Sequence, residues 1–260
     1  MYLSNEIWYI IFSKLCTEDV VSASRVCRVF FNVALSVLCD TRMYKCHANA
    51  LMKFYKLLGS VKHVSYAHIP RHFIVLPRKL ISLSLEYCGE IVCVEAHLAT
   101  IEHLSVEYSP IQKIDLSAMP KIKTITFYTR QLSLEGIFTT FSSSTLESLH
   151  IAAPYVRYPS NFHELFPKLK TLNLFSASFD EEKKLTLPVC IEKVEIFCAN
   201  NIVWNENKFY PKLNHIDIHS FGCVRRLARD IQATSAQSIL ITNSNVAKFA
   251  VTSRKSMSLD

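Results

Sequence analysis

Glycine is scarce in this chain of 260 residues, which contains only Gly59, Gly89, Gly136 and Gly222. Because these glycines lie far apart, neither of the phosphate-cradling loops, G-x-x-x-x-G-K and G-x-G-x-x-G, can be formed. The G-x-S-x-G pattern of a hydrolase nucleophile is absent as well. The sequence therefore lacks the familiar signatures of nucleotide-binding enzymes and hydrolases.

Paired cysteine motifs and secretion signals are also missing. The nine cysteines are irregularly spaced and include no C-x-x-C pair, which excludes a zinc site of the usual finger type. No N-x-Ser/Thr glycosylation acceptor occurs, and no cationic segment precedes an apolar run at the N-terminus. We therefore expect free thiols and a reducing compartment, cytoplasmic, nuclear or both.

Long apolar runs and blocks of one charge are absent too. The apolar stretch nearest the N-terminus, Ile7 to Phe12, is too short to span a bilayer. The net charge is +7, but lysine and arginine are spread along the chain without a block of five or more. Such spacing is typical of a solvated surface. We expect neither membrane insertion nor nucleic-acid binding.

Helical periodicity dominates the first forty residues. Apolar residues recur at helical spacing from Leu3 to Leu15, with Ser4 placed as the N-cap. Thr17 opens a second predicted helix, and a third runs from Val26 to Leu38. Three short helices bury a low fraction of their surface, so this module is expected to need a partner or a neighbouring domain.

This module resembles an F-box, whose motif runs roughly L-P-x-E-I, I-L/F-x-x-L, D-L/V and V-C-x-x-W. The matching residues, in the same order and spacing, are Leu3, Glu6, Ile7, Ile11, Phe12, Leu15, Asp19, Val20, Val26, Cys27 and Phe30. Ser4 replaces the usual proline, and Phe30 replaces the usual tryptophan.

The resemblance implies docking on the Skp-type adaptor of a cullin-RING ubiquitin ligase. It implies these adaptor-binding residues: Leu3, Ser4, Ile7, Ile11, Phe12, Leu15, Asp19, Val20, Val26, Cys27 and Phe30. For each of them, a contact inside the module is the simpler alternative.

From residue 61 the pattern changes to short runs of the form apolar-x-x-apolar-x-apolar. The runs start at Val61, Leu80, Ile101, Ile122, Leu146, Leu169, Ile191, Leu213 and, in a weaker copy, Ala236. Each run alternates as a half-buried strand does, and stacked neighbours would share one continuous core. The period and the L-x-x-L-x-L pattern resemble the leucine-rich repeat family.

Together these patterns predict an α/β fold. A three-helix F-box (1–45) is followed by a connecting or capping helix (46–60), an irregular leucine-rich-repeat solenoid (61–251) and a frayed tail (252–260). The solenoid is expected to have a parallel concave sheet and a convex side that is partly helical and partly extended. The stretches "LEGIFTTF", "NFHELF" and "RRLARDI" are predicted to be helices, "EIVCVEA" and "IQKIDLS" to be extended, and 246–251 to form a last strand.

The polar positions of the strands are expected to face a protein substrate. The predicted substrate-binding residues are Glu86, His103, Glu107, Tyr128, His150, Asn173, Phe175, Glu195, Phe197, His215, Asp217 and His219. Among them, Tyr128, Phe175 and Phe197 occupy the same slot in different repeats, and aligned exposed aromatics suit a hot spot. The alternative is that these rings are partly buried or lie under a loop.

Two features allow chemical interpretations that we do not favour. His215, Asp217 and His219 share one strand face, but adjacent same-face residues lie nearly 7 Å apart, which is wide for a metal. Cys27 lies between Arg25 and Arg28, which can activate a thiol, yet the sequence identifies no base or cleft for it. We expect no catalytic residue, metal or cofactor, and we expect Cys27 to be a small packing residue.

The leading hypothesis is a non-catalytic substrate receptor of an SCF-type ubiquitin ligase. It depends on the joint occurrence of the two motifs, the F-box-like helices first and the repeats after them. The alternative is a repeat scaffold for protein interactions, in which the N-terminal helices serve only as a cap.

Overall fold

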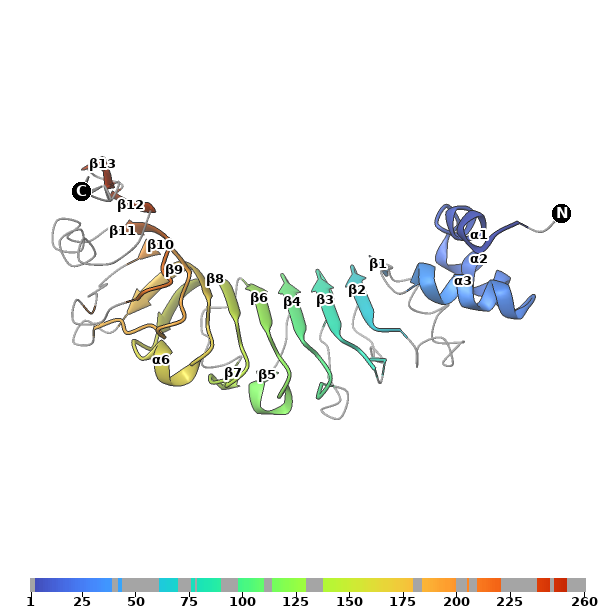
Figure 1. Ribbon diagram of the computed structural model, residues 1–260, viewed down its shortest axis with the longest axis horizontal. Helices are drawn as coiled ribbons and strands as arrows, with labels where there is room; N and C mark the ends of the chain where they lie inside the picture. Colours follow the sequence, from blue (N-terminus) through green and yellow to red (C-terminus); the bar gives the residue numbers. More distant parts are fainter. Residues whose placement is uncertain are drawn as a thin grey trace, which may run out of the picture. The chain divides into compact units, whose positions relative to one another are not determined.

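A computed structural model describes residues 3–38, 42–43, 61–69, 76–77, 79–89, 98–109, 114–129, 138–179, 184–199, 205, 210–220, 238–243 and 246–251. The fold is α/β, with N-terminal helices followed by parallel strands that form a solenoid (Figure 1). The chain divides into two compact units, Met1–Ile114 with Ala118–Ile122, and Asp115–Ser117 with Lys123–Asp260. The predicted boundaries at 45 and 60 lie outside the described residues and stay predictions.

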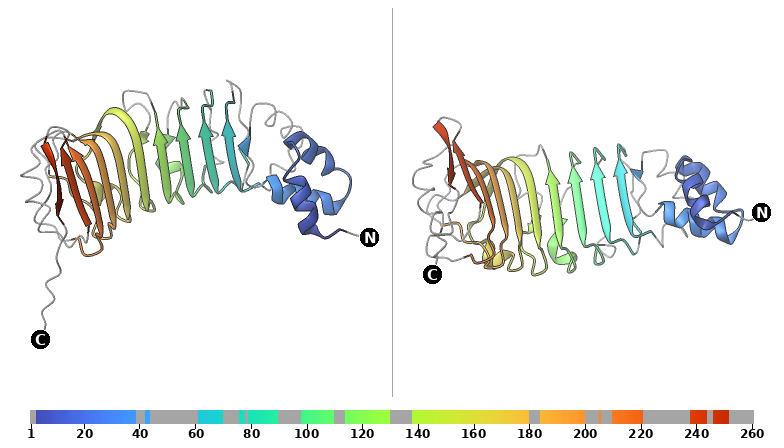
Figure 2. Two further views of the ribbon diagram at one scale, coloured as in Figure 1. Left: turned by 90° about the horizontal axis from the view of Figure 1, so that it is seen from above. Right: turned by 45° about the horizontal axis from the view of Figure 1, so that its top comes forward.

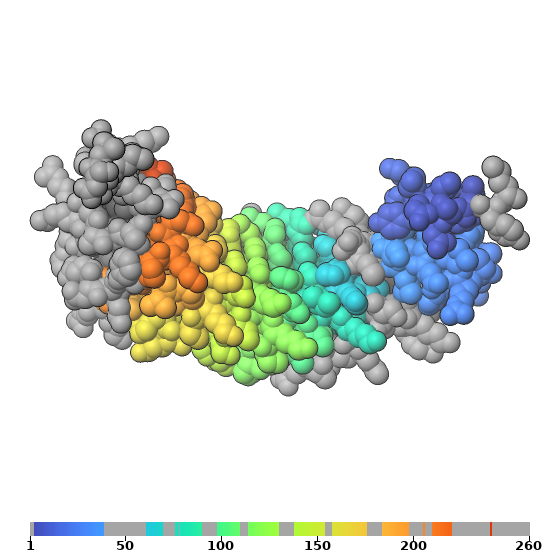
Figure 3. Space-filling view, in the orientation of Figure 1, coloured from blue at the N-terminus to red at the C-terminus, as the bar shows by residue number. Residues whose placement is uncertain are grey.

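The three predicted helices are present in the first unit. They are α1 (Asn5–Phe12), α2 (Thr17–Ala23) and α3 (Arg28–Leu38), and their side chains pack into one body, coloured blue in Figure 3. The core of this body consists of Phe12, Val20, Val21, Val33, Ala34 and Leu38. The third helix begins two residues later than predicted, because Cys27 takes the capping position before it.

None of the helices in the described ranges has the length and apolar character needed to cross a membrane.

The described part of the first unit also contains four parallel strands. They follow one another in the order β1 (Arg42–Met43), β2 (His63–Ala67), β3 (Ser82–Glu86) and β4 (His103–Glu107). The sequence patterns did not predict β1, which has only two residues.

The second unit contains the longer run of strands. In spatial order they are β6 (Thr124–Tyr128), β8 (Ser148–Tyr158), β9 (Thr171–Phe179), β10 (Lys193–Ala199), β11 (His215–Ser220), β12 (Ser238–Asn243) and β13 (Val246–Val251). Both views of Figure 2 show these strands side by side. The predicted last strand is confirmed, and β13 runs antiparallel to β12.

Each predicted run produces a strand that begins two residues after the run starts. A recurring turn explains this offset: Leu169 N donates to Phe166 O (3.1 Å), and Ile191 N donates to Pro188 O (3.1 Å). The next two amides then share one carbonyl of the preceding repeat, as Glu192 and Lys193 do with Lys170 O (2.7 and 3.0 Å). The period of the sequence therefore corresponds to a repeated set of backbone hydrogen bonds.

The apolar positions of each run form the core. Leu169, Leu172 and Leu174 have no exposed surface, and Leu172 lies in register with Val194 of the next strand, which is also fully buried. Each fully buried leucine contributes about 2 kcal/mol through the hydrophobic effect. The alternate positions on the same strands face away from this core and carry the polar and aromatic side chains.

The connecting segments confirm some predictions and correct one. The helix expected from "NFHELF" is present as α6 (Phe162–Leu165). The helix expected from "LEGIFTTF" is wrong over its described part, where β7 (Phe138–Thr140) pairs with β5 (Ile114–Asp115). Phenylalanine followed by two β-branched threonines fits a strand better than a helix.

Over its described part, 114–117, the stretch "IQKIDLS" is extended only at β5, which is followed at once by the 3-10 turn η2 (Leu116–Ala118). The predictions for "EIVCVEA", "RRLARDI", the connecting helix 46–60 and the tail 252–260 fall outside the described residues.

Candidate functional site

Large apolar side chains remain exposed on the helical module of the first unit. They are Leu3, Ile7, Ile10, Ile11, Leu15, Val26 and Val29. The first five follow helical spacing along one side of α1 and its flanks, and the two valines lie where α3 begins. Val26 is 71% exposed, an unusual degree for a large aliphatic residue. We use the name apolar face for these seven residues, five along α1 and its flanks and two at the start of α3; exposed apolar surface is typical of interaction sites.

The predicted adaptor-binding residues divide into two groups. Eight are exposed: Leu3, Ser4, Ile7, Ile11, Leu15, Asp19, Val26 and Cys27. Phe12 and Val20 are buried, and Phe30 is half-buried. The rings of Trp8 and Phe30 lie 4.4 Å apart, and Phe12 meets Phe30 edge-on at 5.2 Å. Phe12, Val20 and Phe30 therefore hold the helices together and support the apolar face from inside.

Val26, the first residue of the third predicted helix, lies outside that helix in the structure. Val33 is buried in the core, whereas Val26 lies before the first residue of α3 and faces solvent. The physical reason is the cap at Cys27, which ends the preceding turn and leaves Val26 outside the helix.

Cys27 itself is exposed and caps α3, so the expectation of a packed thiol is corrected. The backbone N–H of Phe30 donates to Cys27 Sγ at 3.5 Å, and that of Phe31 donates to Cys27 O at 3.0 Å. A side-chain acceptor at this position satisfies an amide that has no partner within the helix. Arg25 and Arg28 are exposed on either side of it.

Ser4 occupies the predicted N-cap position of α1, with extended backbone, but its side chain forms no capping bond. Instead its hydroxyl donates to the carboxylate of Glu6, and this hydrogen bond lowers the pKa of Glu6. The carbonyl of Ser4 accepts the first helical hydrogen bond, from Trp8 N at 3.2 Å. Ser4 therefore starts the helix without a proline.

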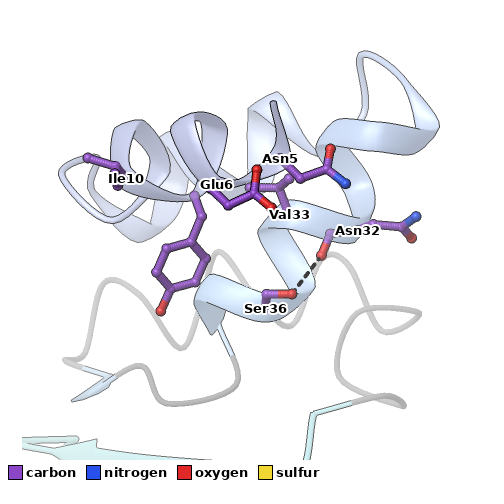
Figure 4. Close-up of a pocket in the computed structure, with 7 residues that line it drawn as sticks. Asn5, Glu6, Ile10, Asn32, Val33 and Ser36 are labelled. Carbon is purple, nitrogen blue, oxygen red and sulfur yellow. Dashed lines mark hydrogen bonds between the residues drawn. The ribbon is translucent and has the colours of Figure 1, made fainter. Parts of the chain in front are cut away.

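A shallow hollow of about 430 Å³ lies between α1 and α3, beside the apolar face (Figure 4). Its lining residues are Asn5, Glu6, Tyr9, Ile10, Asn32, Val33 and Ser36. Ser36 Oγ donates to Asn32 O at 3.2 Å within α3. Ile10 belongs to both surfaces, so the apolar face continues into a partly polar groove.

The second unit carries a row of rings on the outward side of its strands. We call Tyr128, His150, Phe175, Phe197 and His219 the ring ladder. Phe175 stacks on Phe197 with a centroid separation of 4.5 Å, and Phe197 stacks on His219 at 4.7 Å. The predicted alignment of Tyr128, Phe175 and Phe197 is thus extended by two histidines.

His150 enters the ladder because a small residue leaves space for it. Ala152 lies in register between Tyr128 and Phe175, and the ring of His150 fills the gap. The Tyr128 hydroxyl is 2.6 Å from His150 Nε2, and the rings of His150 and Phe175 are 5.8 Å apart. An alanine between two aromatic positions is the sequence signal that could have identified this arrangement.

A row of polar side chains runs beside the ladder, with Asn173, Glu195 and Asp217 in register. Asn173 Nδ2 donates to Glu195 Oε2 at 2.6 Å, and Lys193 Nζ lies 2.7 Å from Glu195 Oε1. These predicted substrate-binding residues therefore do come together, and the hydrogen bond and ion pair hold their side chains in place.

The two histidines of "HIDIH" face different carboxylates. His219 Nε2 lies 3.1 Å from Asp217 Oδ1, whereas His215 Nε2 lies 3.7 Å from Glu195 Oε1 on the neighbouring strand. Within the part of the chain that the structure describes, no group of three metal-ligating side chains occurs. The arrangement is a polar surface next to aromatic rings.

The first unit places the remaining predicted substrate residues, Glu86, His103 and Glu107, at outward positions of β3 and β4. Glu86 and Glu107 lie in register, and Ser105 Oγ donates to Glu107 Oε1 at 3.3 Å. The sequence patterns missed the residues that follow these strands, Tyr87 and Tyr108, which are exposed and stacked on each other.

No family model matches the chain, and no curated protein sequence matches it.

Proposed function

We propose that this chain is a substrate-recognition subunit of an SCF-type ubiquitin ligase. Its helices would dock on a Skp-type adaptor, and the outward strand surface of its repeats, read as leucine-rich repeats, would bind a protein substrate. The single observation that carries the proposal is the exposed apolar face, in the segment whose sequence resembles an F-box. The chain would contribute no catalytic group, because holding the substrate near a charged enzyme is sufficient for transfer.

The burial pattern of the helices supports docking more than capping. A module that only caps a solenoid would bury its apolar side chains against the repeats, yet Ile7, Ile10 and Val26 are widely exposed. Full burial of one such side chain contributes about 2 kcal/mol. An apolar groove of a partner would therefore gain affinity from this face, as in other helix-in-groove complexes.

The ring ladder supports the second half of the proposal. Interface hot spots are typically rich in aromatic side chains. An aromatic ring offers a large contact area and loses little conformational entropy when a partner binds. Glu195 and Asn173 are already held by neighbours, so little conformational entropy is lost when a partner binds.

The test is co-purification of a tagged Skp-type adaptor with three forms of the chain. The wild type and a Val189→Asp control should recover equal adaptor, because Val189 is 66% exposed but lies in the second unit. An Ile7→Asp, Ile11→Asp variant should lose most of the adaptor, since both charges fall on the apolar face. Equal recovery by all three forms, or no recovery by any, would favour the scaffold alternative.

A further inference from the structure

The groove between α1 and α3 combines apolar side chains with polar groups that accept hydrogen bonds. Figure 4 shows the side chains of Asn5 and Glu6 extending from α1 toward α3. The lining residues include one carboxylate, on Glu6, but no lysine or arginine. The groove is therefore a local site of negative charge in a chain whose net charge is +7.

Glu6 supplies the charge of the groove. Its carboxylate accepts hydrogen bonds from the Ser4 hydroxyl and from its own backbone N–H, and these bonds lower its pKa, so the group stays ionised at neutral pH. A carboxylate has about four acceptor positions on its two oxygens, so these two bonds leave others open. Within the described ranges Glu6 takes part in no ion pair. Its negative charge is therefore open to a cation of a partner.

Other groups around the groove add hydrogen-bond acceptors. Ser36 Oγ already donates its proton to Asn32 O at 3.2 Å, so toward the groove it can only accept a hydrogen bond. Ser36 lies in the last turn of α3, where the helix dipole places a partial negative charge and no basic residue of that turn offsets it. Asn5 and Asn32 each contribute a side-chain carbonyl oxygen. The groove thus suits a positively charged group that donates several hydrogen bonds.

Apolar side chains accompany these polar groups. Val33 is buried and contributes to the lining, next to Ile10, which is 59% exposed. Ile10 also belongs to the apolar face, so a partner that covers this face reaches the groove directly. A lysine side chain fits this combination, because its aliphatic stem can lie on apolar surface while its ammonium group meets the acceptors.

We infer that this groove receives a lysine side chain of the partner that docks on the apolar face. The inference rests on the proposed function, since it names one contact of the proposed adaptor interface. Lysine fits better than arginine, because the Ser4 hydroxyl already occupies part of the carboxylate, whereas a guanidinium group pairs best with both oxygens at once. The three donors of an ammonium group can be shared among Glu6, Ser36 and an amide oxygen.

The test is a calorimetric titration of the full chain with a purified Skp-type adaptor in two forms. In one form the adaptor's lysines are dimethylated, which keeps their charge, and in the other they are acetylated, which removes it. The wild-type chain should bind the dimethylated adaptor about fivefold more tightly, a modest charge ratio because the groove is open to solvent. Glu6→Gln should abolish most of this ratio, because the carboxylate that recognises the charge is gone.

Glu164→Gln is the matched control. Glu164 also lies in the first turn of a helix, α6, and its side chain is 65% exposed. Its carboxylate likewise accepts a hydrogen bond from the residue before the helix, from Asn161 Nδ2 at 2.6 Å, but it belongs to the second unit. This variant should keep the wild-type charge ratio. Asn32→Lys should reduce the ratio while Glu6 is retained, because the new ammonium group competes for the carboxylate.

The charge ratio separates a role in binding from a role in folding. If Glu6→Gln only weakened α1, it would weaken binding of both adaptor forms by the same factor and leave the ratio unchanged, which would overturn the inference. A wild-type ratio of one would overturn it too. Together with weaker binding by Glu6→Gln, that result would indicate an arginine or a neutral donor in the groove.

The same titrations separate this inference from the proposed function. Binding of the unmodified adaptor with a charge ratio that Glu6→Gln does not change would reject the lysine contact alone and keep the ligase role. No binding of the unmodified adaptor by the wild-type chain would reject the proposed function and the lysine contact together. Circular dichroism of each variant confirms that a lost signal is not lost folding.

Discussion

Phe175 and Phe197 stack face to face across neighbouring strands of the second unit, with centroids 4.5 Å apart and planes inclined by 11°. They lie in register, so the contact follows from the parallel pairing of β9 and β10. The pair is the centre of the ring ladder, and it links the repeat period of the sequence to a surface that a partner could contact.

This stacking predicts an energetic coupling between the two rings. We expect Phe175→Ala and Phe197→Ala to be non-additive by about 1 kcal/mol, because an aromatic pair contributes that much beyond its buried area. The measurement is a double-mutant cycle by urea denaturation. Phe175→Ala combined with Val189→Ala serves as the uncoupled control, and purely additive effects at the two phenylalanines would contradict the stacking.

The cap at Cys27 predicts a specific pattern of substitutions. Cys27→Ser should leave the stability of the first unit unchanged or raise it, because a hydroxyl accepts the Phe30 N–H at least as well as a thiol. Cys27→Ala should cost about 0.5–1 kcal/mol, since that amide loses its acceptor. Urea denaturation checks both values, and equal stability of the serine and alanine variants would remove the capping role.

The ion pair between Glu147 and Lys170 predicts a pH dependence. Their side chains meet at 2.7 Å, and the Lys170 ammonium lowers the pKa of Glu147 by hydrogen bonding and by charge. A carboxyl with a lowered folded-state pKa stabilises the fold above its unfolded-state pKa, about 4.3, and loses that contribution as the pH falls through the folded value.

The difference in melting temperature between wild type and Glu147→Gln should therefore be present at neutral pH and vanish in acid. It should also shrink in high salt, because the Lys170 and Glu147 side chains are 44% and 40% exposed and the ions of the solvent screen their charges. A difference that persists at pH 2 would show that the glutamate acts by packing and not by its charge.

The repeats were predictable because one physical rule recurs in each of them. Apolar residues such as Leu169, Leu172 and Leu174 must be buried together, and the strand period fixes which side chains face outward. The helices were predictable for the same reason, from their apolar spacing. Strand β7 (Phe138–Thr140) was not predicted, because a short stretch of this kind fits either a helix or a strand. Its pairing with β5 determines the strand conformation.

The candidate site was predictable only in part. Sequence spacing aligned Tyr128, Phe175 and Phe197, but the place of His150 depends on the small size of Ala152, two residues further along the same strand. The stacked rings of His68 and Tyr87 lie outside the alternating pattern, because both residues follow their strands with a left-handed backbone. The burial of each motif residue likewise follows only from the structure. Motif matching alone cannot distinguish Phe12, which is buried between the helices, from Ile11, which is exposed to solvent.

The most direct test of the account is the dissociation constant between the purified chain and a purified Skp-type adaptor, measured by titration calorimetry. Val26→Asp should weaken binding by about tenfold or more, because it places a charge in an apolar contact at its most exposed residue. The matched Val189→Asp should bind with the wild-type constant. The account is contradicted if wild type shows no binding, or if Val26→Asp and Val189→Asp bind equally well.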